Sequence, residues 1–168
     1  MSDIEWTVES LGPKIDEFLN PVLDAADLDV DYDIFEVHDG LEIIGPELTV
    51  DFEGRDARLL LRRRAELLLA LEQLTLEALR VPHRDRYRLI FDVDDYRMLR
   101  IEELCEKAKK AAEQVKKTGR PYEMRPMTSR ERRIVHVTLN EDDEVTTASV
   151  GTPPYRYTIV GLRQPTAG

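Results

Sequence analysis

The most regular hydrophobic pattern in the chain runs from residue 101 to residue 115. Apolar side chains recur there at three- and four-residue spacings, which places them on one face of an α-helix. They are Ile101, Leu104, Cys105, Ala108, Ala111, Ala112 and Val115. Gly119 and Pro121 follow at positions typical of a helix end. The pattern therefore predicts one long amphipathic helix that ends before Gly119, with Cys105 on its buried face.

The spacing changes after this helix and predicts a short strand, a second helix and a hairpin. The strand is expected over residues 122–127. The sequence Thr128-Ser129-Arg130-Glu131 matches a capping box, in which the outer two residues hydrogen-bond each other's backbone N–H, so a helix should begin there and run to about residue 140. Alternating apolar residues over 145–151 and 155–162 predict the two strands of the hairpin.

The first part of the chain predicts a different order: helix, strand, strand, short helix, helix and strand. The expected elements span residues 13–26, 30–37, 41–50, 56–61, 65–79 and 87–93. His38-Asp39-Gly40 has the chemistry of a tight turn between the first two strands, and Gly45-Pro46 predicts an edge position or a bulge in the second. We therefore expect an α+β protein with two small domains, residues 1–95 and 96–168.

Charge is distributed unevenly over these two parts. The chain has 168 residues and a formal net charge of −10. Residues 1–60 hold 17 acidic and 3 basic residues, a net of −14, whereas residues 61–168 hold 17 acidic and 21 basic residues, a net of +4. The net charge of the whole chain argues against nucleic-acid binding, but the positively charged second part can still bind phosphate groups. An uneven solvated surface gives the same numbers, so charge alone does not decide.

Composition and motifs predict the cellular compartment of the protein and argue against several kinds of catalytic or metal-binding site. No apolar run approaches the ~20 residues that a membrane-spanning helix needs, and the acidic first residues do not resemble a signal peptide. With a single cysteine, which can form no internal disulfide, this predicts a cytoplasmic protein. The three histidines lack metal-ligand spacing, and no phosphate-binding loop or nucleophile motif is present. We expect no enzyme, no cofactor and no metal.

Arg132 and His136 are the strongest candidates for a binding site. They stand four residues apart and therefore share one face of their predicted helix. The buried side should be taken by the apolar residues of the same segment, Ile134, Val135, Val137 and Leu139, which places the pair at the exposed edge. Arginine donates paired hydrogen bonds to phosphate, and histidine donates one or stacks on a base. Taken alone, such a pair is more often an ordinary surface pair.

The residues around this pair resemble a known domain. The run RPYEMRPMTSRERRIVH, residues 120–136, and the hairpin residues 147–151 and 156–160 are similar to the C-terminal domain of the Jag, or KhpB, family. This R-three-H domain is named for its Arg-x-x-x-His motif. The family's motif residues contact single-stranded nucleic acid, and they match Arg132 and His136. The resemblance thus implies that the chain binds single-stranded RNA or DNA through these two side chains.

The same family places a type II KH domain before the R-three-H domain, and residues 9–95 have its order of elements. A KH domain holds the sugar-phosphate backbone with a Gly-x-x-Gly loop between two helices. The corresponding places hold Arg62 and Ala65, so the tight loop is expected to be lost and the two helices can fuse. Two interpretations stay open. Either Arg62, Arg63 and Arg64 hold phosphate by charge, or this half is a scaffold that docks a partner, for which the family implies a small KH-domain protein.

The sequence therefore predicts a non-catalytic, cytoplasmic bacterial protein that binds single-stranded nucleic acid, RNA being expected before DNA. Arg132 and His136 are the predicted contacts. Supporting charge is expected from other arginines: Arg125, Arg130, Arg133, Arg156, Arg62, Arg63 and Arg64. The alternative is a protein-interaction adaptor, which is favoured by the missing glycines and by the acidic first sixty residues.

Overall fold

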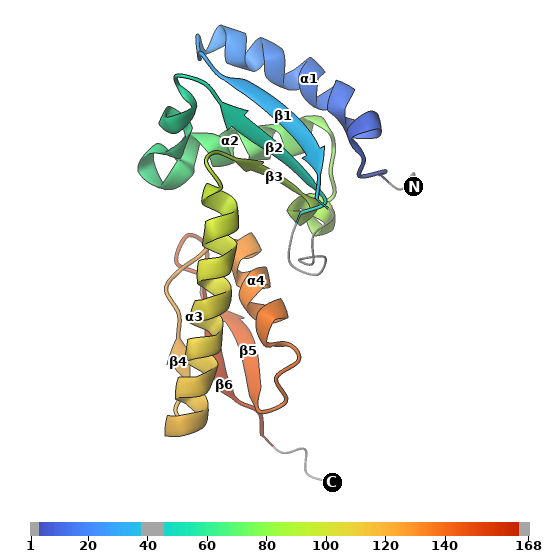
Figure 1. The fold of residues 1–168 in the computed structure, drawn as a ribbon. Helices are drawn as coiled ribbons and strands as arrows, with labels where there is room; N and C mark the ends of the chain where they lie inside the picture. Colours follow the sequence, from blue (N-terminus) through green and yellow to red (C-terminus); the bar gives the residue numbers. More distant parts are fainter. Residues whose placement is uncertain (1–3, 38–45, 165–168) are drawn as a thin grey trace. The chain divides into compact units, whose positions relative to one another are not determined.

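The computed structural model describes residues 4–37 and 46–164, which form two compact units (Figure 1). The first unit is Met1–Met98 and the second is Leu99–Gly168. Each unit combines helices with its own three-stranded sheet, which confirms the predicted α+β class. Within the described residues, no helix is both long enough and apolar enough to cross a lipid bilayer.

The first unit packs helices against a mixed sheet. Its elements are α1 (Val8–Ala25), β1 (Asp31–Glu36), β2 (Leu48–Glu53), the 3-10 helix η1 (Ala57–Leu61), α2 (Arg62–Ala78), the 3-10 helix η2 (His83–Arg88) and β3 (Leu89–Asp92). The strand order is β1-β2-β3, with β1 antiparallel and β3 parallel to the central β2. Ile15 of α1, Leu68 of α2 and Phe91 of β3 are fully buried in one core. The predicted order of elements is observed, with η2 as an addition.

Several boundaries in this unit differ from the expected ones, and two of the differences have a clear cause. Helix α1 begins at Val8 rather than at residue 13, because the Thr7 side chain caps it by accepting a hydrogen bond from the Ser10 N–H at 3.2 Å. Strand β2 continues to Glu53 rather than ending at residue 50, because it pairs with β1 along its whole length. The predicted turn at 38–40 and residues 41–45 of the predicted second strand lie outside the described residues.

The connection between η1 and α2 has a left-handed backbone. Arg63, Arg64 and Ala65 have φ/ψ angles of 51°/49°, 61°/42° and 60°/33°. A residue that carries a Cβ atom is disfavoured in this region by roughly 1–2 kcal/mol, which is why glycine is common there. The expected loss of the tight loop is wrong, and the two helices do not fuse, because these three residues interrupt the right-handed helical path. A tight connection is thus kept without glycine.

The second unit contains most of α3 and all of the elements that follow it. The elements are α3 (Tyr96–Thr118), β4 (Tyr122–Glu123), α4 (Ser129–Leu139), β5 (Val145–Val150) and β6 (Tyr157–Leu162). Its antiparallel sheet has the order β4-β6-β5. Strand β4 ends at Glu123 rather than at residue 127. Beyond β4, the Met124 N–H still donates to the Thr158 carbonyl of β6, and the Met127 N–H donates to the Arg156 carbonyl just before β6. Pro126, between them, has no N–H to donate.

Burial alternates along the strands of this sheet and distinguishes its two faces. Thr158 and Val160 are fully buried, and they pair with Ser149 and Thr147, whose side chains contact α4. We call this the inner face. The intervening residues point the other way, and they are exposed or half-buried. This outer face, formed by Ala148, Val150, Tyr157 and Ile159, is not covered by any helix of the described ranges.

Candidate nucleic-acid interface

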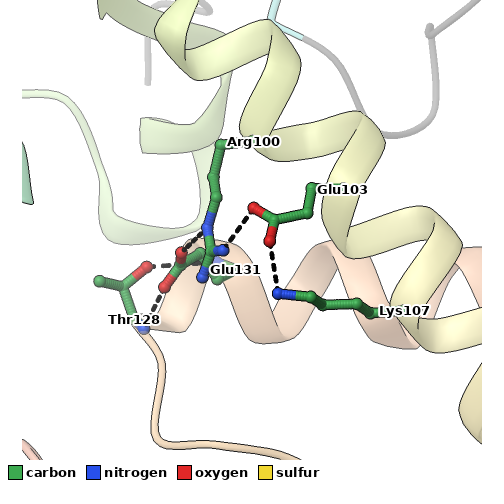
Figure 2. A network of polar contacts seen from close by, with 5 residues as sticks. All are labelled: Arg100, Glu103, Lys107, Thr128 and Glu131. Atoms are coloured by element: carbon green, nitrogen blue, oxygen red, sulfur yellow. Dashed lines mark hydrogen bonds and ion pairs between the residues drawn. The ribbon is translucent and has the colours of Figure 1, made fainter.

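The first turn of α4 is held in place from two sides (Figure 2). Thr128 Oγ1 accepts a hydrogen bond from the Glu131 N–H at 3.2 Å, and Glu131 Oε2 accepts one from the Thr128 N–H at 2.9 Å. This confirms the predicted capping box. The second oxygen of Glu131 accepts a hydrogen bond from Arg100 Nε of α3 at 2.9 Å. One carboxylate therefore caps α4 and ties it to α3.

The bridge continues along α3. Arg100 Nη1 also donates to Glu103 at 2.8 Å, and Lys107 donates to the other oxygen of Glu103 (Figure 2). Lys107 and Arg100 hold the pKa of Glu103 at about 2, so this bridge stays charged at neutral pH. Because sliding α4 along α3 breaks these contacts, the side chains of the first turns of α4 have well-defined positions.

Arg132 follows Glu131 on α4 and lies close to Arg156, the residue before β6. Arg132 Nη1 donates to the Met127 carbonyl at 2.9 Å. The Nε atoms of Arg132 and Arg156 are both buried, and neither has a hydrogen-bond partner among the described residues. Burial and the positive charge of Arg156 lower the pKa of Arg132. Within the described part of the chain, neither guanidinium forms an ion pair with a carboxylate.

Two neighbouring guanidinium groups without a counter-charge favour an anion as their partner. Buried arginine side chains are normally paired, and two like charges placed together repel each other. Thr158, two residues after Arg156 in the chain, also has a fully buried hydroxyl without a hydrogen-bond partner in the described ranges. A phosphate suits such a place, because its oxygens accept the N–H groups in pairs and its charge neutralises both arginines.

His136 lies one turn after Arg132 and is bound by two hydroxyl groups of β5. Its Nδ1 is 2.6 Å from Thr147 Oγ1, and its Nε2 is 2.9 Å from Ser149 Oγ. The expectation that the Arg132–His136 pair stands at the exposed edge is wrong: both side chains are half-buried, because β5 packs against this face of α4. A ligand that reaches the ring nitrogens of His136 has to replace one of these hydroxyl partners.

The pKa of His136 provides a direct test of this environment. Burial and the charge of Arg132 lower it from the ordinary value of 6.5. Since the unfolded chain then binds the proton more tightly, the contribution of neutral His136 to stability is complete above pH 6.5 and is lost as the pH falls toward the folded-state pKa. An NMR titration of the imidazole signals, assigned with His136→Gln, measures this pKa. A value at or above 6.5 would contradict the arrangement.

The remaining predicted site residues fall into two groups. Arg125, before α4, and Arg133, on α4, are exposed, and Arg130 is half-buried in the first turn of α4. They belong to the same unit as Arg132. The second group, Arg62, Arg63 and Arg64, is exposed at the left-handed connection of the other unit, so it forms a separate cationic segment.

Three polar residues of the inner face were missed by sequence reasoning: Thr147, Ser149 and Thr158. Thr147 and Ser149 stand two apart in a predicted strand, which places them on one face. The sequence alone does not predict that these side chains contact His136, because the contact depends on how β5 packs against α4. Arg100 was missed for the same reason, since its contact with Glu131 joins residues from two helices.

The chemistry of this interface is positive charge and hydrogen bonding. Among the described residues, no group of three or more His, Cys, Asp or Glu side chains is placed to hold a metal ion. Cys105 lies half-buried on α3, where its Sγ accepts a hydrogen bond from Thr138 Oγ1 at 3.3 Å.

Comparisons with known proteins point to the same part of the chain and beyond it. Residues 102–161 match the model of the R-three-H domain. The chain is 34% identical over 156 residues to the RNA-binding protein KhpB of Clostridium symbiosum, an alignment that covers 93% of this chain and 68% of that protein. Identity to the RNA-binding protein KhpB of Bacillus subtilis is 36% over 113 residues, covering 66% of this chain and 54% of that protein. The protein of the same name from Lactiplantibacillus plantarum is 30% identical over 139 residues, 83% of this chain and 40% of its own length. The chain thus spans about half the length of the last two relatives.

Proposed function

Since the chain belongs to the KhpB (Jag) family and carries an R-three-H domain, we propose that it binds single-stranded RNA at the Arg132–Arg156 site. The observation that carries this proposal is the pair of neighbouring guanidinium groups whose buried Nε atoms have no partner in the described ranges. Binding is non-catalytic and takes place in the cytoplasm, and the ligand is held by charge and hydrogen bonds alone.

In this site the two arginines bind a phosphate of the strand, and His136 binds a base or a ribose. Arg132 and Arg156 take one phosphate of the strand between them, because their planar forks offer N–H groups in pairs. His136 is neutral at pH 7 and therefore adds no charge for a phosphate. A neutral imidazole beside two hydroxyl groups instead suits a base edge or a ribose 2′-hydroxyl.

Arg125, Arg130 and Arg133 support this contact at longer range. Cations near a phosphate-binding site raise the rate of encounter and the affinity at low salt, and both effects weaken as salt screens the charges. Their contribution is not specific for sequence, since contacts to phosphate are the same for every nucleotide.

A smaller share of the binding falls to the first unit, which we propose is a KH-like domain with an altered loop. Its exposed arginines at 62–64 add positive charge, but their Cβ atoms obstruct the close backbone approach that glycines permit. The sheet of this unit also carries three carboxylates side by side, since Asp33 pairs with Asp51 and Asp51 with Asp92. Burial and the neighbouring Asp92 raise the pKa of Asp51. Of this row, the exposed carboxylate of Asp33 is the one placed to repel RNA.

The same row of carboxylates supports a second candidate function, a protein-interaction adaptor. Asp33 and Asp51 place two carboxylates on neighbouring strands, Asp33 exposed and Asp51 half-buried, with the buried Asp92 beside them, and a basic partner protein complements such acidic groups. In that case the first unit docks the partner, and RNA binding by the second unit is weak or absent.

Salt dependence distinguishes the two candidates. We expect a fluorescently labelled single-stranded RNA to bind the full chain at about 50 mM salt and markedly less at about 200 mM, because each phosphate contact releases bound counter-ions with a log–log slope of roughly −0.7 for single strands. Fluorescence anisotropy measures both affinities, and a duplex of the same sequence is the control. If the chain shows no binding at low salt, or binds the duplex equally well, the RNA proposal fails and the adaptor is favoured.

A further inference from the structure

The outer face of the β4-β6-β5 sheet is an apolar surface with an aromatic residue at one end, where β6 begins. Val150 pairs with Tyr157 and Ala148 pairs with Ile159, so the four side chains lie together on this face. Val150 is 39% exposed, Ala148 is exposed, and Tyr157 and Ile159 are half-buried. The face of β6 that carries the Tyr157 side chain is therefore turned to solvent instead of to a core.

Charge is scarce on this face, although charged residues make up 35% of the chain. Thr146 and Gly161 continue the outer face and pair with each other, and they too are uncharged. Glu123 of β4, which pairs with Ile159, is the charged residue that the described strands place there. An open sheet surface with so little charge, in so charged a protein, indicates a binding surface more than a solvated one.

A second tyrosine lies two residues before Tyr157 in the chain, just outside β6. Tyr155 lies in the connection between β5 and β6 and is 74% exposed. Arg156 lies between Tyr155 and Tyr157 in the chain, and its positive charge acts on Arg132 of α4, whose pKa it lowers. Three consecutive residues thus join the cationic site to the outer face, at the point where β6 begins.

We propose that the outer face is a stacking platform for the bases of the single-stranded nucleic acid whose phosphate Arg132 and Arg156 hold. This inference rests on the proposed function and extends it from the backbone to the bases. Tyr157 and Tyr155 take one base each, and Val150, Ala148 and Ile159 provide the apolar floor. Stacking is tolerant of sequence, because every base has a π-face.

Bases fit this surface better than a protein partner does. A standard protein–protein interface needs about 20–30 residues on each side, whereas the outer face offers four apolar side chains next to an exposed tyrosine. A base needs only one ring and a little apolar surface around it, with positive charge close by for its phosphate. The outer face and the Arg132–Arg156 pair supply these in adjacent residues.

The test compares ring-removing variants with ring-keeping variants in the full chain. We expect Tyr155→Ala to weaken binding of a single-stranded RNA by about 5- to 100-fold, the range of base stacking on aromatic side chains, and Tyr155→Phe to bind within about twofold of the unaltered chain. Tyr157→Leu, which keeps apolar bulk but removes the ring, is expected to lose affinity in the same way. Because Tyr155 is 74% exposed, its replacement leaves the fold intact, and circular dichroism verifies this for all variants.

A second arm uses the ligand. An RNA of the same length with abasic sites in its centre keeps the phosphates and removes the bases, so it should bind as weakly as the unaltered RNA binds to Tyr155→Ala. If the abasic strand and the tyrosine variants bind normally while Arg132→Ala does not, the stacking platform is wrong and the phosphate site stands. If no single strand binds at low salt, the proposed function and the platform both fail.

Discussion

Replacing Arg132 by alanine is expected to weaken the binding of single-stranded RNA by about 10- to 100-fold. A hydrogen bond to a charged group contributes about 1.5–3 kcal/mol, and each 1.4 kcal/mol changes the affinity about tenfold. Arg132→Lys keeps the charge but not the planar fork, so an intermediate loss is expected. The slope of log affinity against log salt should also become shallower, because one phosphate contact is removed. Anisotropy titrations at several salt concentrations measure both quantities.

Lys110→Ala provides the matched control for this experiment. Its side chain is 76% exposed on α3, and its removal changes the net charge by the same amount as the removal of Arg132. The double variant Arg132→Ala/Arg156→Ala should lose less than the product of the two single losses, because in the proposed site both arginines bind the same phosphate. If Arg132→Ala and Lys110→Ala bind alike, Arg132 contributes only general charge and the proposed site is wrong.

The largest effect on stability is expected at Glu72, in the first unit. Glu72 Oε2 accepts hydrogen bonds from the Phe91 N–H at 2.9 Å and from Arg97 Nη1 at 3.1 Å. The side chains of Arg97 and Glu72 are 12% and 8% exposed. Glu72→Ala leaves the Arg97 charge buried without this partner, and breaking such a pair costs about 3–5 kcal/mol of the free energy of unfolding.

Urea unfolding followed by tryptophan fluorescence measures this loss. Trp6 is the single tryptophan of the chain and is 6% exposed in the core of the first unit, so its emission reports on that unit. Arg58→Ala is the control, because it breaks an exposed pair with Asp94 whose side chains are 87% and 62% exposed. Such pairs contribute about 0–1 kcal/mol. A Glu72→Ala variant as stable as Arg58→Ala would show that the buried pair contributes little.

The elements that sequence reasoning located well are those defined by local interactions. The capping box of α4 joins residues three apart, and the periodic face of α3 repeats within one helix. Both patterns are complete within a short segment, so the sequence displays them directly. The hairpin of β5 and β6 is also local, since its two strands are consecutive.

What the sequence did not reveal depends on contacts between distant segments. Arg156 was expected only as supporting charge, and its effect on Arg132 depends on the contact between α4 and β6, which are far apart in the sequence. The half-burial of His136 depends on Thr147 and Ser149, which lie on another element. The left-handed backbone at 63–65 has no local signal at all, because arginine and alanine disfavour it.

That left-handed segment inverts the usual rules of mutational tolerance for a stretch of three residues. In the body of α2, glycine is among the worst replacements at an exposed position and alanine the best. At Arg63 and Arg64 the ranking is reversed: glycine, and next asparagine, fit the positive φ angles better than the native residues, whereas valine, isoleucine and proline are excluded although the side chains point into solvent. Ala65 is 0% exposed, so it combines this backbone restriction with a strict limit on size.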